Sequence, residues 1–331
     1  EVTRPMTKWA VELNRADRVA EIVDKAFHIA NSGRPGPVVI SLPEDIDRSS
    51  TAQHSVWRSS TVGIPSLSTK GVAKAVSMIE DAERPCIVAG EGILRVDATD
   101  KLIRFAECLG APVFTAWRRF DTFPNKHPLY MGGLNLSSVS NDLSEPLKNA
   151  DLIIAIGTRL DEFTTLSYSS PSTEQKLIHI DQSPEETGGS WIGADLALVA
   201  DAGEAMDKLE EALKNSKRAK PSKARQKQIA DWSEYFRRRT TPRSNRIGLK
   251  DGTIDLEGVY HDILNILTDD ASITCDAGDF GSWLIRYYKW NQPRTFFGPT
   301  TGAMGYALPA AIAAKLARPQ APAIAFAGDG G

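Results

Sequence analysis

Short apolar runs alternate with helical stretches along most of this chain, and this alternation constrains the fold more strongly than any other feature. The runs are rich in β-branched residues and span 38–42, 86–90, 111–115, 152–157 and 177–181. The stretches between them repeat apolar residues at helical spacing, as in 16–30, 71–81 and 101–109. Buried strands that are joined by helices form parallel sheets with helices on both faces. We therefore expect an α/β protein with doubly wound parallel sheets.

A chain of 331 residues is longer than one hydrophobic core usually supports, and its composition divides it into parts. One polar segment, rich in serine and threonine, follows the first strand, and a strongly charged segment begins near residue 209. A helix that is capped by Asp255 opens the last part. The other elements expected there lie at 272–276, 283–290, 307–316 and 323–327. The resulting boundaries are 1–48, 49–66, 67–213, 214–250 and 251–331.

Composition and charge exclude several classes of protein. The net charge of −3 gives no basic surface for nucleic acid or anionic lipid, and no apolar run is long enough to span a bilayer. The first residues do not resemble a signal peptide. Cys86, Cys108 and Cys275 are widely spaced among apolar residues, which indicates buried thiols in a reducing compartment. We expect a cytoplasmic enzyme that contacts neither nucleic acid nor a membrane.

Three glycine-containing turns follow consecutive strands of the last part. They are DAGDFG at 276–281, GPTTGAMG at 298–305 and GDG at 328–330. Glycine lets the backbone approach a phosphate closely, and the helix after the second turn offers free N–H groups. Asp329 supplies a carboxylate of the kind that binds a hard cation bridging a diphosphate. Each turn alone is more often a simple loop, but together, at consecutive strand ends, they predict a site for a diphosphate and a metal ion.

Several segments resemble one known family. GAMGYALPAA at 302–311 and AGDGG at 327–331 resemble the thiamine-diphosphate domain of acetolactate synthase-like enzymes. GRPGPV at 33–38 resembles the last strand of the family's pyrimidine-binding domain, and GTRL at 157–160 resembles its central domain. The resemblance implies the thiamine-diphosphate-enzyme three-domain architecture, truncated at both ends. It assigns the C-terminal end of the pyrimidine-binding domain to 1–48, a linker to 49–66, the central Rossmann-like domain to 67–213, an exposed helix and linker to 214–250, and the N-terminal half of the diphosphate-binding domain to 251–331.

The resemblance also implies roles in binding thiamine diphosphate and Mg²⁺. Asp329 matches the family's Mg²⁺ ligand, and the carbonyl of Gly302 matches the acceptor for the cofactor's 4′-amino group. Met304 matches the apolar residue that holds the cofactor in its bent form. The other cofactor-binding residues that it implies are Ala277, Gly278, Asp279, Phe280, Gly330 and Gly331.

The family decarboxylates or joins 2-oxo acids, as lyases or transferases of the acetolactate synthase or decarboxylase type. This implies a 2-oxo acid substrate and a homodimer or homotetramer whose chains share each active site. The family's activating Glu should precede Glu1, and the Asn that completes the Mg²⁺ shell should follow Gly331. We therefore expect a fragment that is inactive by itself and binds the cofactor feebly, with its catalytic residue unknown.

The central domain departs from the flavin-binding members of the family. Their GARFDDR-like run reads GTRLDEF at 157–163, without the second arginine, and WRRFD at 117–121 replaces an MGLG-like stretch. FAD is therefore possible but disfavoured. Arg159 and Asp181 could bind ADP or form a structural ion pair. Arg118 and Arg119 could meet an acidic substrate or be solvated surface residues.

Two hypotheses compete with the interpretation that the chain is part of an enzyme. The chain could be a nucleotide- or flavin-binding module without catalysis, or a catalytically inactive paralogue.

His127 could line the site, but a histidine that caps a turn is the simpler interpretation, and the other histidines show no metal-ligand spacing. We expect the aromatic cluster to pack a helix at a subunit contact; its members are Trp283, Tyr287, Tyr288 and Trp290.

Overall fold

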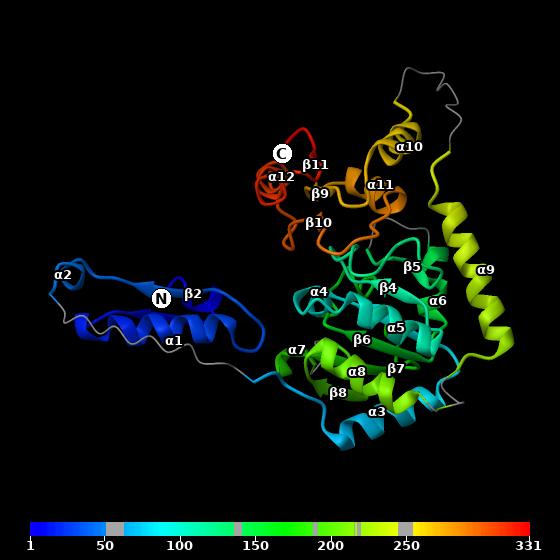
Figure 1. Cartoon of the computed structure of the whole chain (residues 1–331), viewed down its shortest axis with the longest axis horizontal. Coiled ribbons are helices and arrows are strands. Elements are labelled where there is room, and N and C mark those ends of the chain that lie inside the picture. The colour runs from blue at the N-terminus through cyan, green and yellow to red at the C-terminus, as the bar shows by residue number, and fades with distance from the viewer. Residues whose placement is uncertain (51–62, 136–140, 188–190, 215, 217–219, 244–253) are drawn as a thin grey trace. The chain divides into compact units, whose positions relative to one another are not determined.

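The computed structural model describes residues 1–50, 63–135, 141–187, 191–214, 216, 220–243 and 254–331 (Figure 1). The chain forms two compact units, residues 1–65 and residues 66–331. No helix within these described ranges is long and apolar enough to cross a membrane.

The first unit is a small parallel β-α-β motif. Strand β1 (Trp9–Glu12) pairs with β2 (Val38–Ser41), and Trp9 lies opposite Val38. Helix α1 (Val19–Asn31) connects the strands, and the short α2 (Glu44–Asp47) follows β2. The sequence predicts α1 and β2. It does not predict β1, because four residues ending in a glutamate carry too weak a pattern.

A six-stranded parallel sheet forms the centre of the second unit. Its strand order is β5-β4-β3-β6-β7-β8. The strands are β3 (Pro85–Ala89), β4 (Val113–Thr115), β5 (Tyr130–Gly133), β6 (Leu152–Ile156), β7 (Lys176–Asp181) and β8 (Leu196–Val199). The chain order runs outward from β3 on one side and from β6 on the other, which is the doubly wound order of Rossmann folds. The predicted fold class is confirmed.

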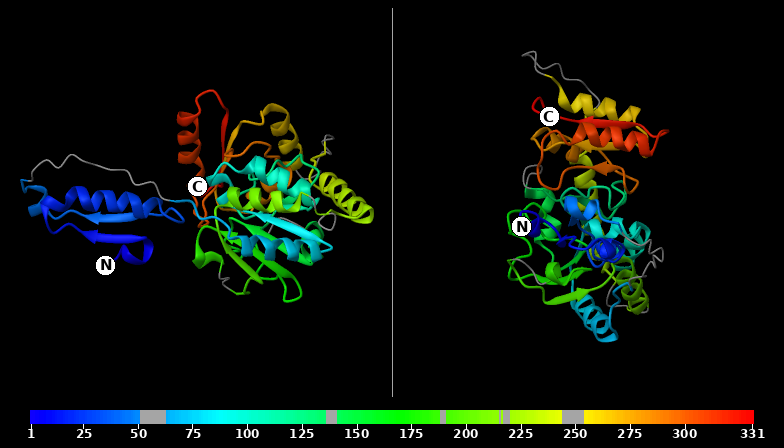
Figure 2. Two further views of the ribbon diagram at one scale, coloured as in Figure 1. Left: turned by 60° about the horizontal axis from the view of Figure 1, so that its bottom comes forward. Right: turned by 90° about the vertical axis from the view of Figure 1, so that its left-hand side faces the viewer.

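Helices cover both faces of this sheet (Figure 1, Figure 2). One face carries α3 (Thr69–Asp81), α4 (Glu91–Arg95), α5 (Thr99–Leu109) and α8 (Ala202–Leu213). The other face carries α6 (Glu145–Lys148) and α9 (Lys223–Arg239), while α7 (Pro184–Thr187) follows β7. Successive strand residues alternate between the two cores, because side chains point to opposite faces: Ile87 packs in the first and Cys86 in the second.

A smaller parallel sheet, in the order β10-β9-β11, ends the second unit. Its strands are β9 (Ser272–Cys275), β10 (Phe296–Phe297) and β11 (Ala323–Phe326), and its helices are α10 (Leu256–Ile266), α11 (Phe280–Tyr287) and α12 (Ala307–Ala317). The Asp255 side chain accepts a hydrogen bond from the N–H of Gly258 at 3.2 Å, which confirms the predicted cap. Helix α11 begins and ends before the predicted range, because the turn after β9 is short.

Residues 117–127 join the two sheets of the second unit. Phe120, after β4, is fully buried and stacks on Trp290 with ring centroids 5.5 Å apart. The buried Asp121 carboxylate accepts hydrogen bonds from the N–H groups of Thr295 (2.9 Å) and Phe296 (3.2 Å). Trp290 and the neighbouring Tyr288 are buried in this core, and Tyr287 is buried beside Tyr260. The expectation of a subunit contact is therefore wrong for these three side chains.

The charged segment 214–250 contains a helix, but it starts later than its composition suggests. Pro221 precedes Ser222, whose hydroxyl caps α9 by accepting a hydrogen bond from the N–H of Arg225 at 3.2 Å. Helix α9 buries Arg225 and Ile229, so it is not exposed on every side. Residues 244–250 of this segment lie outside the described residues.

Candidate functional site

The three glycine turns meet at one edge of the smaller sheet. Residues 276–281 follow β9, residues 328–331 follow β11, and residues 298–305 lead from β10 to α12. Because the three strands are parallel, these turns all leave from the same carboxyl edge. The structure thus places all nine of the residues that the sequence suggests for the cofactor and metal in these turns.

The buried carboxylate of Asp276 joins the first turn to the second. Its Oδ2 accepts a hydrogen bond from the N–H of Gly305 at 3.0 Å, and its Oδ1 accepts one from the N–H of Ala307 at 2.5 Å. A carboxylate at a helix start also interacts favourably with the helix dipole, here that of α12. Asp276 is not among the site residues that the resemblance implies, although an aspartate directly after a buried strand is a signal that could have revealed its role.

Glycine is required in these turns for two different reasons. Gly302 and Gly305 adopt left-handed backbone conformations, with φ of +70° and +77°, and a Cβ on either would meet open space. The third turn is instead closely packed. A Cβ on Gly331 would lie 2.3 Å from Oδ2 of Asp276, whereas one on Gly330 would meet only Cε of Met304, 2.6 Å away at the flexible end of that side chain. The turns therefore form a cradle of bare backbone.

The chemistry of this cradle fits a diphosphate with a bound cation. The N–H groups of Gly278, Asp279 and Phe280 have no hydrogen-bond partner among the described residues, and free N–H groups at a helix start bind phosphate. Asp329 is exposed. No cluster of three or more His, Cys, Asp or Glu side chains suited to a metal occurs in the described ranges. A cation at Asp329 would therefore need backbone carbonyls and phosphate oxygens as further ligands.

A cavity of about 660 Å³ adjoins the cradle. The first turn and residues 300–302 line one side, and the loops after β4 and β6 line the other with Trp117, Arg118, Arg159 and Phe163. Its volume lies in the range of small-molecule sites. Gly302, which the resemblance places at the cofactor's amino group, borders this cavity.

Arg118 is a buried cation in the wall of the cavity. The residue is 5% exposed, and its φ of +60° is a left-handed conformation that bulky side chains rarely adopt. Nη1 and Nη2 lie 3.5 and 3.3 Å from the carbonyl oxygens of Cys275 and Asp276. Nε has no hydrogen-bond partner among the described residues, and burial lowers the pKa of the guanidinium. The structure excludes a solvated surface position for Arg118.

The other two arginines behave differently from Arg118. Nη2 of Arg119 pairs with Oε2 of Glu91 at 2.9 Å, which ties it to the start of α4. Arg159 is exposed and lines the cavity. Neither Arg159 nor Asp181 takes part in an ion pair within the described residues, so the expected structural ion pair is absent there.

The two segments that depart from the flavin-binding pattern touch each other. Trp117 stacks on Phe163 with ring centroids 4.5 Å apart and planes 15° apart. The guanidinium of Arg118 lies 4.7 Å from the centre of the Trp117 ring. The N–H of Trp117 donates to Oγ1 of Thr164 at 3.0 Å, which fixes the aromatic pair in the cavity wall.

The backbone of two loops fills the crevice between β3 and β6, which is the switch point where the strand order of the larger sheet reverses. A Cβ on Gly90, after β3, would lie 2.3 Å from the carbonyl oxygen of Gly157, after β6. The N–H of Gly92 donates to the same oxygen at 3.0 Å. Rossmann folds hold a dinucleotide's pyrophosphate at this point. The close approach of the two loops leaves little room for one here.

The remaining candidates have structural roles. Nδ1 of His127 accepts a hydrogen bond from the N–H of Leu129 at 3.2 Å, so this histidine caps a turn as predicted. His179 is fully buried beside the carbonyl of Thr158, and burial lowers the pKa of its imidazole. Cys86 and Cys275 are buried free thiols, as predicted, whereas Cys108 is partly exposed.

Comparisons with known proteins agree with this arrangement. The chain matches the acetolactate synthase large subunit of Buchnera aphidicola (subspecies Schizaphis graminum) at 29% identity, over 99% of the chain and 57% of that protein. It matches the acetolactate synthase large subunit of Corynebacterium glutamicum at 30% identity, over 99% of the chain and 52% of that protein. The chain thus spans about half the length of these curated relatives.

A solved structure shares the fold. The X-ray structure of a candidate thiamin diphosphate-dependent enzyme isolated from Mycobacterium smegmatis superposes with a TM-score of 0.77 at 24% identity, over 97% of this chain and 59% of that one. Two family models match the chain itself. The central domain of thiamine pyrophosphate enzymes matches residues 72–209, and the C-terminal TPP binding domain of these enzymes matches residues 276–331. The chain therefore carries the central domain of thiamine pyrophosphate enzymes and residues of their C-terminal TPP binding domain.

Proposed function

We propose that the protein uses thiamine diphosphate and Mg²⁺ to decarboxylate or join 2-oxo acids, as a lyase or transferase of the acetolactate synthase type. The observation that supports this most directly is the meeting of three glycine turns at one sheet edge, held by Asp276, within the matched TPP binding domain. The proposal includes a homodimer or homotetramer in the cytoplasm, and the domain assignment that gives residues 1–48 to a pyrimidine-binding domain.

Each part of the cradle has a role in this proposal. Asp329 would hold Mg²⁺, and the N–H groups of residues 278–280, which have no partner among the described residues, would bind the diphosphate. The carbonyl of Gly302 would accept a hydrogen bond from the cofactor's amino group, and Met304, whose Cε lies beside Gly330, would supply an apolar contact to the cofactor. Bound thiamine diphosphate would supply the nucleophilic carbon that attacks the substrate's oxo carbon.

The cavity beside the cradle would take the 2-oxo acid. Arg118 carries a charge in a desolvated wall, where its interaction with an anion is stronger than in water. Nε of Arg118 has no hydrogen-bond partner in the part of the chain that the structure describes, so not all donors of this guanidinium are in use there. We propose that Arg118 orients an acidic substrate toward the cofactor.

FAD or ADP is less favoured. The Trp117–Phe163 pair occupies the segments where the chain departs from the flavin-binding pattern. The backbone contact between Gly90 and Gly157 takes the space that a pyrophosphate would need at the switch point. Both observations argue against a nucleotide-binding module as the main function.

Calorimetric titration of thiamine diphosphate into the protein, with and without Mg²⁺, tests the proposal. We expect saturable binding that requires Mg²⁺ and is lost in Asp329→Ala, because that variant removes the carboxylate proposed to hold the cation. Asp100→Ala, which removes an exposed carboxylate on α5, is the matched control and should bind normally. Absence of binding, or equal binding by both variants, would refute the cofactor assignment.

A further inference from the structure

A second cavity, of about 230 Å³, lies at the carboxyl edge of the six-stranded sheet. Residues of β4, β5, α9 and α11 line it, together with residues from the loops that follow β5 and β6. Among the described residues that line the two cavities, only Ile285 of α11 borders both the second cavity and the one beside the cradle. The cofactor and substrate proposed above therefore leave the second cavity unused.

Two glycines of β5 border the second cavity. Gly132 adopts a φ of +120°, and a Cβ there would lie 3.0 Å from Cε2 of Phe236 on α9. A Cβ on Gly133 would lie 2.3 Å from Cδ1 of Phe120. Glycine at both positions lets α9 and the loop after β4 pack closely on β5. It also leaves this part of the cavity wall as backbone, with no side chain to fill the space.

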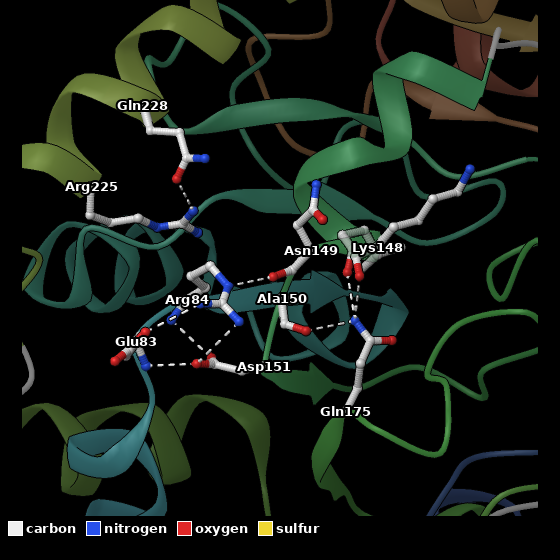
Figure 3. Close-up of polar contacts among 10 residues, drawn as sticks. Glu83, Arg84, Lys148, Asn149, Ala150, Asp151, Gln175, Arg225 and Gln228 are labelled. Atoms are coloured by element: carbon white, nitrogen blue, oxygen red, sulfur yellow. Dashed lines mark hydrogen bonds and ion pairs between the residues drawn. The ribbon is translucent and has the colours of Figure 1, made fainter.

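The 3₁₀ helix η3 (Asn141–Ser144) contributes a further part of the wall. Helix α6 follows it directly, and hydrogen bonds from two side chains hold the end of α6 (Figure 3). Nε2 of Gln175 donates to the carbonyl of Ala150 at 2.8 Å, and Nε of Arg84 donates to the carbonyl of Asn149 at 2.8 Å. These bonds anchor the wall to the neighbouring strands without a ligand, so the second cavity is preformed.

A run of left-handed backbone separates the two cavities. Leu166, Ser167 and Tyr168 adopt φ of +54°, +57° and +59°, which costs free energy in residues other than glycine. The hydroxyl of Thr165 helps to hold the run: it accepts a hydrogen bond from the N–H of Tyr168 at 3.1 Å and donates to the carbonyl of Asp161 at 2.8 Å. Leu166 and Ser167 line the second cavity, whereas Tyr168 lines the one beside the cradle. Such strain is concentrated at ligand sites.

The lining of the second cavity favours a small ligand with an apolar body. Its apolar side chains are Phe114, Met131, Leu134, Leu143, Leu166, Phe236 and Ile285. Three buried polar side chains lie among them, those of Asn135, Ser144 and Thr240. An engineered apolar cavity of about 150 Å³ accommodates benzene, whereas sites for drug-sized ligands begin at about 300 Å³. A body of about the size of one benzene ring therefore fits.

Arg286 is the only charged side chain among the described residues that line the second cavity. Its Nε donates to the carbonyl of Arg239 at 3.1 Å, and the residue takes part in no ion pair within the described ranges. Glu257, on the neighbouring α10, pairs instead with Arg243 at 2.6 Å. A cation in a partly desolvated wall attracts an anion more strongly than a cation in water does. The lining thus favours one negative charge on the ligand.

We propose that the second cavity binds a small apolar monocarboxylate, with its carboxylate at Arg286 and its body among the apolar side chains. A guanidinium is the donor that matches a carboxylate best, and the preformed apolar wall excludes water from the body of the ligand. Apart from Ile285, the described side chains that line the two cavities are different. Binding here therefore does not depend on the proposed function.

The test is calorimetric titration of the full chain, without thiamine diphosphate and at constant ionic strength, with benzoate, benzamide and acetate in separate experiments. We expect saturable binding of benzoate that is at least about tenfold tighter than that of benzamide, which has the same shape without the charge. Acetate has the charge without the apolar body and should show no saturable binding over the same concentrations.

Three variants locate the binding site. Arg286→Gln should weaken benzoate binding at least about tenfold, as loss of a charged hydrogen bond implies. Leu143→Phe adds volume inside the second cavity and should weaken the binding of benzoate and benzamide alike. Arg159→Gln makes the same charge change in the wall of the cavity beside the cradle, so it should bind benzoate as the parent does.

Far-UV circular dichroism checks that each variant is folded. If Arg286→Gln does not fold, the comparison of benzoate with benzamide in the parent and in Leu143→Phe still decides the question. No saturable binding of benzoate, or equal affinities for benzoate and benzamide, would overturn the proposal, and so would acetate binding as tight as that of benzoate. Loss of binding in Arg159→Gln but not in Arg286→Gln would assign the carboxylate to the other cavity and overturn it as well.

Discussion

At the scale of single residues, Asp276 determines how the cradle is held together. Its two carboxylate oxygens each accept one N–H, from Gly305 and from Ala307. An asparagine would turn an NH₂ group toward one of these donors. We expect Asp276→Asn to lower the free energy of unfolding by about 2 kcal/mol, the size of a hydrogen bond to a charged group. Urea denaturation followed by tryptophan fluorescence measures it.

Asp329→Asn separates stability from binding in the same site. Asp329 is exposed and makes no hydrogen bond among the described residues, so we expect a change of less than about 0.5 kcal/mol in the free energy of unfolding. Both variants should weaken binding of thiamine diphosphate with Mg²⁺. Equal stability of the two variants would show that Asp276 does not organise the turns.

Arg118 combines backbone strain with a buried charge, and two substitutions separate these effects. Arg118→Gly and Arg118→Ala both delete the guanidinium, but only glycine adopts a φ of +60° without cost. We expect the glycine variant to be more stable than the alanine variant by about 1 kcal/mol, which urea denaturation of both proteins measures. An alanine variant that is as stable as the glycine variant would show that the backbone there is unstrained.

The burial of Arg118 could not be predicted from the sequence. A run of two arginines beside a tryptophan is typical of a solvated loop, and only the packing of residues 117–127 on the smaller sheet encloses this side chain. The glycine turns are different, because the requirement for glycine is local and shows directly in the sequence. The glycine turns of the site were therefore predictable, because local backbone geometry defines them. The burial of Arg118 was not predictable, because the packing of two sheets against each other causes it.

At the scale of elements, Lys289 links α9 to the segment after α11. Its ammonium donates to the carbonyl of Arg286 at 3.0 Å and lies 5.3 Å from the centre of the Phe236 ring. Burial lowers its pKa to about 7. Between this value and the ordinary value of 10.5 the unfolded chain binds more protons than the folded chain, so stability should rise with pH across this window.

Lys289→Met should remove that rise. Methionine keeps the length of the side chain without a titrating group, so the free energy of unfolding should vary less between about pH 7 and pH 10 than in the parent protein. Lys176→Met, at an exposed lysine, is the control. Parallel pH profiles of the free energy of unfolding for the parent and Lys289→Met would contradict the conclusion that burial lowers the pKa of Lys289.

The elements that the sequence predicts best are those whose pattern is strong by itself. Strands β3 and β6 are continuous apolar runs, and each lies close to its expected range. Strand β7 also lies close to its expected range, although His179 interrupts its apolar residues. Strand β5 was missed because two of its four residues are glycines, and Gly132 packs against Phe236 of α9 rather than following a strand pattern. Such a strand exists because its neighbours β4 and α9 hold it in place.

At the scale of the whole molecule, the two units differ in how much core each contains. All three clusters of buried apolar residues consist of residues from Leu67 onward. The first unit, in the part of it that the structure describes, buries only Leu13, Ile22 and Ala26, and it leaves Phe27 61% exposed. A two-stranded sheet with one helix is marginal by itself. The second unit should therefore carry nearly all of the stability of the chain.

Deleting residues 1–65 tests this division. We expect the chain 66–331 to fold and to melt within about 3 °C of the parent, because no core cluster loses a member and a change of 1 kcal/mol shifts the melting temperature by only a few degrees at this size. The peptide 1–65 should show no cooperative unfolding, because its few buried side chains cannot offset the entropy of ordering the chain. Circular dichroism melts of both pieces measure this. Cooperative melting of the peptide, or collapse of 66–331, would mean that the first unit contributes stability that its buried surface does not account for.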